Sequence, residues 1–250
     1  MMLPLLGLIG LVVSMLYTWL GIAYASTIIV IAGLLGLDVN RLVAPILLSQ
    51  VFAAAAGTTV RRVSRRGGGG AGLLESMAMG AAALAALAAA MLVGVRLPGP
   101  ERVYGNALLL AAAAAVNLAR PASGRPGGRR GGLGGLLAAG LATGLVKGVL
   151  GGGATPVMVA AQRILGEGFD AAVLRTLAAE LVICLVASAP YLLAYGANPA
   201  AFAVLSASSV AGVLLGSMAS ARVSQAARRT SSSILMAALA AAAAARLAGL

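Results

Sequence analysis

Apolar residues fill ten runs of the chain, and short polar or glycine-rich connections separate them. Most of the runs approach the roughly 20 residues that an apolar helix needs to cross a bilayer. The pattern predicts an all-α integral membrane protein. No basic segment precedes the first run, so we expect a membrane element there rather than a signal peptide. The runs cover residues 3–20, 27–37, 42–60, 73–95, 103–119, 133–150, 155–166, 171–195, 200–221 and 231–248.

The ten runs form two sets of five with similar spacing. One constant shift in numbering superimposes the breaks between the runs, because the shift that places Gly21 on Gly151 also places Gly36 on Gly166. We call this shift the repeat offset. A repeat of this kind predicts an internal duplication. The predicted units are a first membrane repeat, a cytoplasmic linker and a second membrane repeat, at residues 1–120, 121–132 and 133–250.

The arginines predict that the two halves face opposite ways. Residues 61–66, after the third run, contain four arginines, whereas the counterpart in the second half has no charge. The linker and residues 222–229 are also rich in arginine, and the positive-inside rule places such connections in the cytoplasm. The connection after the fourth run is nearly balanced in charge, with Arg96, Glu101 and Arg102. Equivalent connections then lie on opposite sides, so the repeat is inverted and both termini lie outside.

Equivalent connections can lie on opposite sides of the membrane only if each half makes an odd number of crossings. Each half is therefore predicted to be a re-entrant or broken helical hairpin followed by three transmembrane helices. The run over residues 155–166 supports this, because 12 residues at 1.5 Å each span only about 18 Å of a bilayer core of roughly 30 Å. We expect a multi-pass protein of the cytoplasmic membrane.

The sharpest interruption of the pattern is a glycine triplet followed by a Thr-Pro pair. Glycine and proline both disfavour helix, and a broken helix at membrane depth needs protein or an aqueous cavity around its freed backbone groups. Secondary transporters build substrate sites in this way. We therefore predict that the amides of residues 151–155 in this break bind a ligand. The break consists of Gly151, Gly152, Gly153, Ala154, Thr155 and Pro156.

Two charged residues lie at membrane depth near this break. Lys147 is the only lysine and lies about 17–21 Å into its helix. It is interpreted as a fixed cation that attracts an anion, or alternatively as a lysine that extends its ammonium to the interface. Glu180 lies about 14 Å into its helix. It is interpreted as a proton carrier or gate, or alternatively as the structural ion-pair partner of Lys147 or Arg175.

The first half is expected to supply polar groups that face the break. Ser26 and Thr27 follow Gly21, and Gln50 corresponds to Glu180 under the repeat offset. The alternative for Gln50 is a hydrogen bond between helices without any ligand. Asp38 and Asn40 precede the third run and are interpreted as helix caps.

Small residues recur every four positions on two of the predicted helices, and this spacing is typical of close helix packing in lipid. We interpret both stripes as packing surfaces. The stripes are Gly140, Gly144, Gly148 and Gly152, and Ser208, Gly212, Gly216 and Ser220.

Composition narrows the classes of function. Hydrophobic residues make up 61% of the chain and charged residues 10%, against about 25% charged in soluble domains. The net charge of +12 is concentrated in connections, which favours anionic lipid over nucleic acid. There is no histidine, and Cys184 is the single cysteine. No disulfide, metal, cofactor or catalytic residue is therefore expected, and the protein is not expected to be an enzyme.

The second half resembles the sulfite exporter TauE/SafE-like permeases. That family has a glycine-rich stretch followed by proline in a duplicated helical domain, and a late GxxxG-type helix that ends in a basic residue. Two features depart from the family pattern: the first half keeps one glycine of three in GIAYAST, and position 147 is lysine. The resemblance is carried by GLATGLVKGVLGGGATP, AVLRTLAAEL and SSVAGVLLGSMASARVS, with Gly212, Gly216 and Arg222 in the last segment.

The resemblance implies movement of small sulfur oxyanions or organosulfonates across the cytoplasmic membrane, with proton coupling. We expect a secondary transporter that works by alternating access, with the break, Lys147, Ser26, Thr27 and Gln50 around the anion and Glu180 exchanging a proton. The alternatives are a passive anion channel and a non-transporting membrane assembly subunit. The expected partners are a small inorganic or organic anion and the lipid bilayer, without nucleic acid. The sequence is also compatible with a homodimer.

Overall fold

The computed structural model describes residues 2–64, 73–119, 132–220 and 223–249. All regular secondary structure in these ranges is α-helix, so the all-α prediction is confirmed for the described part of the chain. The helices are α1 (Met2–Leu20), α2 (Tyr24–Leu34), α3 (Val39–Ser64), α4 (Leu73–Gly94), α5 (Gly99–Ala119), α6 (Leu133–Leu150), α7 (Ala154–Ile164), α8 (Phe169–Tyr195), α9 (Pro199–Ser220) and α10 (Gln225–Leu247).

Seven of the described helices are long and apolar enough to cross a membrane, namely α1, α3, α4, α5, α6, α8 and α9. The chain is therefore a multi-pass helical membrane protein. Helix α2 has only 11 residues, about 16 Å at 1.5 Å per residue. Helix α10 has 23 residues but is not among the seven. The expected span over residues 231–248 thus differs from the others, because three serines and two arginines occupy the first half of α10.

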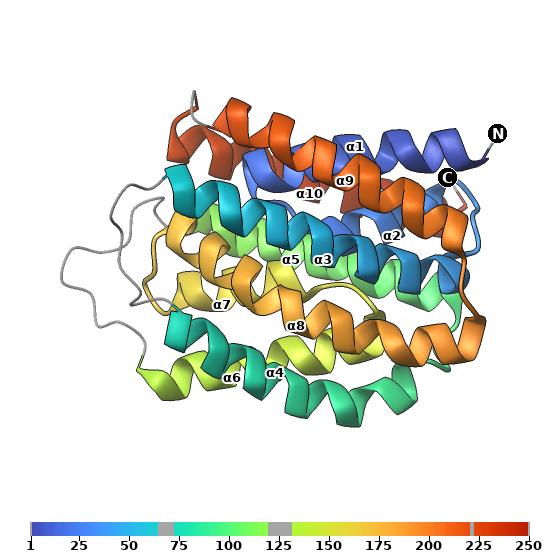
Figure 1. Cartoon of the computed structure of the whole chain (residues 1–250), viewed down its shortest axis with the longest axis horizontal. Helices are drawn as coiled ribbons and strands as arrows, with labels where there is room; N and C mark the ends of the chain where they lie inside the picture. Colours follow the sequence, from blue (N-terminus) through green and yellow to red (C-terminus); the bar gives the residue numbers. More distant parts are fainter. Residues whose placement is uncertain (1, 65–72, 120–131, 221–222, 250) are drawn as a thin grey trace.

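Helices α1 and α2 form a hairpin, and so do α6 and α7. Each hairpin turns at a glycine in the left-handed conformation, Gly21 with φ 74° and Gly151 with φ 72°, which glycine adopts without the steric cost of a Cβ. In Figure 1, α1 starts at the end of the molecule where α10 finishes, and α2 returns toward that end. Helix α6 starts at the opposite end, and α7 returns toward it. The two hairpins therefore enter the helical bundle from opposite ends.

The two stripes of small residues are packing surfaces, as predicted. A Cβ placed on Gly140 would lie 2.3 Å from the carbonyl oxygen of Met79, so α6 touches the backbone of α4. A Cβ on Gly212 would lie 2.3 Å from the carbonyl oxygen of Leu11, so α9 touches the backbone of α1 in the same way. These contacts produce two tightly packed pairs, α4 with α6 and α1 with α9.

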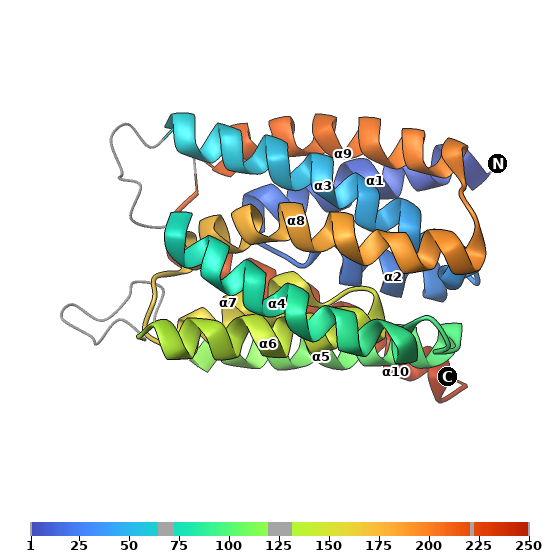
Figure 2. The ribbon, with the colours of Figure 1, turned by 60° about the horizontal axis from the view of Figure 1, so that its bottom comes forward.

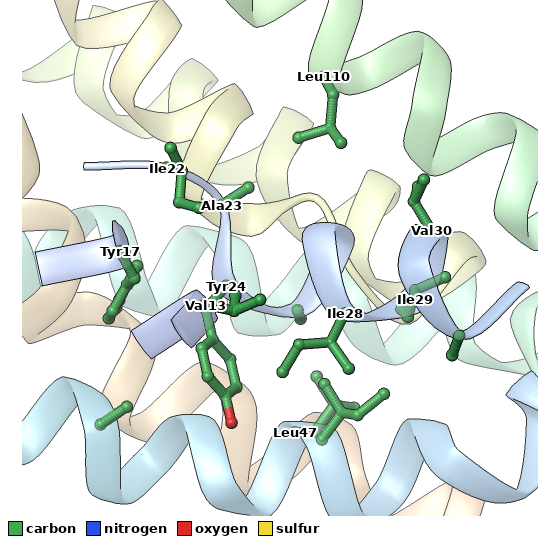
Figure 3. Packing of buried hydrophobic residues seen from close by; sticks show 14 of the residues in the cluster. Val13, Tyr17, Ile22, Ala23, Tyr24, Ile28, Ile29, Val30, Leu47 and Leu110 are labelled. Carbon is green, nitrogen blue, oxygen red and sulfur yellow. The ribbon is translucent and has the colours of Figure 1, made fainter. Parts of the chain in front are cut away.

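Helices α3 and α8 lie between these two pairs (Figure 1), and in Figure 2 α8 separates α3 and α9 from α4 and α6. They pack against each other, while α3 also packs against α9 and α8 against α4. Helix α5 packs against α10. Helix α2 is buried at the centre: Ile28 meets Leu47 of α3 on one side, and Leu110 of α5 lies on the other side of α2 (Figure 3). The short helix α2 is therefore held inside the bundle by apolar contacts.

The predicted orientation in the membrane depends on arginines in the connections. Most of these arginines, including those at 65–66, 120–130 and 222, lie outside the described residues, as does nearly all of the predicted linker. The cytoplasmic placement of these connections remains a prediction.

Candidate functional site

The break between α6 and α7 lies inside the protein, and side chains from other helices hold its carbonyl end. The last four carbonyls of a helix have no partner within that helix. Here all four accept hydrogen bonds, so the broken end of α6 is tightly fixed. Lys147 O accepts from the Gly151 amide (2.9 Å), Gly148 O from Tyr191 Oη (3.2 Å), Val149 O from Arg102 Nη1 (3.5 Å) and Leu150 O from Asn106 Nδ2 (3.3 Å).

Arg102 is therefore not the connection residue that the sequence suggested. It lies in the first turn of α5 and has 0% of its surface exposed. Its Nε donates to Asn40 Oδ1 at 3.1 Å, so Asn40 binds this arginine, whereas Asp38 caps α3 by accepting from the Arg41 amide at 3.4 Å. The sequence gives no sign that Arg102 is buried, because prolines and a glycine precede it, and these residues are typical of a turn.

The amide end of the break faces the first half of the chain. The Gly153 amide donates to Ser26 Oγ at 2.6 Å, so the structure brings Ser26 to the break. A Cβ on Gly152 would lie 2.3 Å from Asn106 Oδ1 and 3.1 Å from Ser26 Oγ, so a side chain at this position would displace Asn106. Thr27 is buried nearby in α2, but within the described residues its hydroxyl has no hydrogen-bond partner. Ala154 is the first residue of α7.

A second group of polar side chains lies around the carboxyl of Glu180, which is 0% exposed. Tyr17 Oη donates to Oε2 at 2.8 Å, and Thr155 Oγ1 donates to Oε1 at 2.5 Å. Thr155 is part of the break and Tyr17 belongs to α1, so Glu180 of α8 ties together both hairpins. Tyr17 was not among the predicted site residues.

Lys147 completes this group, and it does not extend to the membrane interface, because it is 0% exposed. Its Nζ donates to Gln50 Oε1 at 3.5 Å, and it also interacts with the thiol of Cys184 and, electrostatically, with Glu180. Among the described residues no direct ion pair joins Lys147 to Glu180. Arg175, the alternative partner of Glu180, pairs instead with Glu75 at 2.6 Å and Glu167 at 2.7 Å.

The hydrogen bonds of this group repeat at the offset that relates the two halves. The repeat offset places Tyr17 on Lys147 and Gln50 on Glu180. Tyr17 binds Glu180, and Lys147 binds Gln50. In each contact a donor from the long helix of one hairpin meets an acceptor from the other half. We call Tyr17, Gln50, Lys147, Thr155 and Glu180 the central polar cluster.

These observations define the class of the protein as a multi-pass helical membrane protein with a buried polar centre at a broken helix. No family model matches the chain, and no curated protein and no solved structure matches it. The resemblance to TauE/SafE-like permeases therefore remains an expectation from sequence motifs.

Proposed function

We propose that the protein is a secondary transporter for a small anion and that it works by alternating access between two inverted halves. Transporters of this type bind substrate near the bilayer midplane, at the interface of their repeats and beside broken helices. The central polar cluster lies between the two hairpins and is built from both halves of the chain. Its members are fully buried, which favours an occluded carrier over an open channel.

The helix boundaries support an inverted repeat. The repeat offset carries the bounds of α2, Tyr24–Leu34, onto the bounds of α7, Ala154–Ile164. The left-handed glycines of the first half, Gly21 and Gly36, also have counterparts at Gly151 and Gly166, which again have positive φ values. The packing also agrees with a repeat. Helix α1 corresponds to α6, and α4 corresponds to α9, so the pair of α1 with α9 is the counterpart of the pair of α6 with α4. Opposite directions of the two hairpins in Figure 1 support the inversion.

The observation that carries the anion proposal is the fully buried ammonium of Lys147. A charge at membrane depth costs at least about 2.5–3.5 kcal/mol, and such a group is normally paired. The hydrogen bond of the Lys147 ammonium goes to the neutral amide of Gln50, while the Glu180 oxygens accept from Tyr17 and Thr155. The ammonium therefore retains the capacity to bind an anion that reaches the break.

The resemblance suggests a sulfur oxyanion or an organosulfonate as the substrate, and the cytoplasmic membrane as the location. Glu180 is the candidate proton carrier, because it shares the central polar cluster with Lys147. When an anion approaches Lys147, protonation of Glu180 would keep a second negative charge away from it. This coupling predicts that an inward proton gradient accelerates uptake.

Replacement of Lys147 by methionine is expected to reduce anion uptake about 10- to 100-fold. Hydrogen bonds to charged groups contribute roughly 1.5–3 kcal/mol, and 1.4 kcal/mol corresponds to a factor of ten. Uptake of sulfite, sulfate, thiosulfate and small sulfonates would be measured in proteoliposomes, with and without a pH gradient. Arg41→Met is the matched control, because Arg41 also carries a positive charge but its side chain is 75% exposed.

Unchanged uptake by Lys147→Met would remove the lysine from the mechanism. Flux that ignores the pH gradient and fails to saturate would indicate a passive channel instead. A wild-type protein that carries none of these anions and co-purifies with another membrane protein would indicate an assembly subunit.

A further inference from the structure

The guanidinium of Arg102 joins both halves of the chain at one end of the molecule. Its N–H groups donate to acceptors on four segments, two in the first half and two in the second. None of these acceptors is a carboxylate, so the buried charge is held by dipoles. The acceptors are Asn40 Oδ1 (3.1 Å), Gly94 O (2.7 Å), Leu97 O (3.2 Å), Val149 O (3.5 Å) and Tyr191 Oη (2.9 Å).

The position of Arg102 suits a cation. Gly94 is the last residue of α4, and Val149 is the penultimate residue of α6. The carbonyl end of a helix carries a partial negative charge, and two such ends meet the same guanidinium here. The ring of Tyr191 lies beneath the guanidinium at 5.0 Å, which adds a cation–π contact. Arg102 therefore connects α4, α5, α6, α8 and the start of α3 in one buried network.

The opposite end of the molecule is held by different chemistry. There Arg175 of α8 pairs with Glu75 of α4, with side chains 13% and 29% exposed. This contact is a partly exposed ion pair, whereas Arg102 is fully buried and, among the described residues, binds no carboxylate. The repeat offset places Arg102 on Ser232, so the repeat does not reproduce the arginine at that end. The two ends are therefore unequal.

We propose that Arg102 is a latch that closes the central polar cluster from the end where α1 begins, and that opening this end breaks its bonds to Val149 and Tyr191. Both broken bonds join the first half to the second. The latch rests on the proposed transport function, because only alternating access requires this end to open. It also implies that the resting protein is closed at the Arg102 end.

The chain carries its own reporter for this inference. Cys184 is the single cysteine, it is 0% exposed, and its thiol interacts with Lys147. A membrane-impermeant methanethiosulfonate would be added to either side of sealed vesicles, with orientation determined from an N-terminal tag. Arg102→Met is expected to raise the rate of Cys184 modification about tenfold or more from the α1 end, with little change from the other end. Cys184→Ser gives the background.

Three further variants make the result specific. Tyr191→Phe and Asn40→Ala each remove one contact of Arg102 and are expected to raise the rate from the same end by a smaller factor. Glu75→Gln removes a contact at the opposite end and is the matched control, with no expected increase from the α1 end. If Arg102→Met does not fold, Tyr191→Phe and Asn40→Ala still test the latch.

The latch would be overturned if Cys184 in folded Arg102, Tyr191 and Asn40 variants reacted no faster than in the wild type. It would also be overturned by equal increases from both ends, or by the same increase in Glu75→Gln. If only the transport proposal is wrong, the outcome is different. The variants would then still label faster from the α1 end, but the wild-type protein would show no anion uptake.

Discussion

Replacement of Gly144 by leucine is expected to separate α4 from α6 and to prevent stable folding. A Cβ at this position would lie 2.0 Å from the carbonyl oxygen of Ala83 and 2.8 Å from its carbonyl carbon. These are backbone atoms in the middle of α4, so no side-chain rotation can relieve the clash. Overpacking in a well-packed core typically costs about 1–3 kcal/mol, and we expect at least the upper end of that range. Thermal unfolding in detergent and the monodisperse fraction would measure the loss.

The matched control is Gly134→Leu on the same helix. A Cβ on Gly134 has no heavy atom within 4 Å, and the residue is exposed. The substitution removes a glycine from a helix, which favours helix by up to about 1 kcal/mol. The control is therefore expected to be neutral or slightly stabilising. Equal damage from both substitutions would mean that close contact between α4 and α6 is not what stabilises this pair.

Local patterns in the sequence predicted the helices well. The run predicted over residues 133–150 coincides with α6, Leu133–Leu150, and the run over 155–166 corresponds to α7, Ala154–Ile164. Hydrophobic length, glycine triplets and proline are local signals, and they act on the backbone where they occur. The depths of Lys147 and Glu180 follow from the same counting, and both residues are fully buried.

The partners of these residues could not be predicted in the same way, because they depend on contacts between distant segments. Arg102 binds a carbonyl 47 residues later in the chain and a tyrosine 89 residues later. A buried arginine in the first turn of a helix has the same local pattern as an arginine in an exposed connection between helices. Tyr17 is different, because the repeat offset, applied backwards from Lys147, could have identified it.

Single removal of either charge in the central polar cluster is expected to destabilise the protein strongly. The two single losses of stability, added together, are expected to exceed the loss in the double variant. Lys147→Met leaves the Glu180 carboxyl without a compensating positive charge, and Glu180→Gln leaves the buried ammonium without a negative one. Removing one partner of a buried charge arrangement typically costs about 3–5 kcal/mol. Because the two charges act on each other across the cluster, we expect a coupling energy of about 1–3 kcal/mol in a double-mutant cycle.

Free energies of unfolding for the wild type, both single variants and the double variant would be measured in the same detergent. Glutamine is chosen at position 180 because its amide oxygen can still accept a hydrogen bond from Tyr17 or Thr155. A second cycle with Arg175→Met is the control, since Arg175 pairs with Glu75 and Glu167, and its coupling to Glu180 is expected to stay below about 0.5 kcal/mol. Additive effects of Lys147→Met and Glu180→Gln would show that the two charges are independent. In that case Lys147 would have no electrostatic influence on Glu180, and proton coupling relayed through the lysine would be excluded.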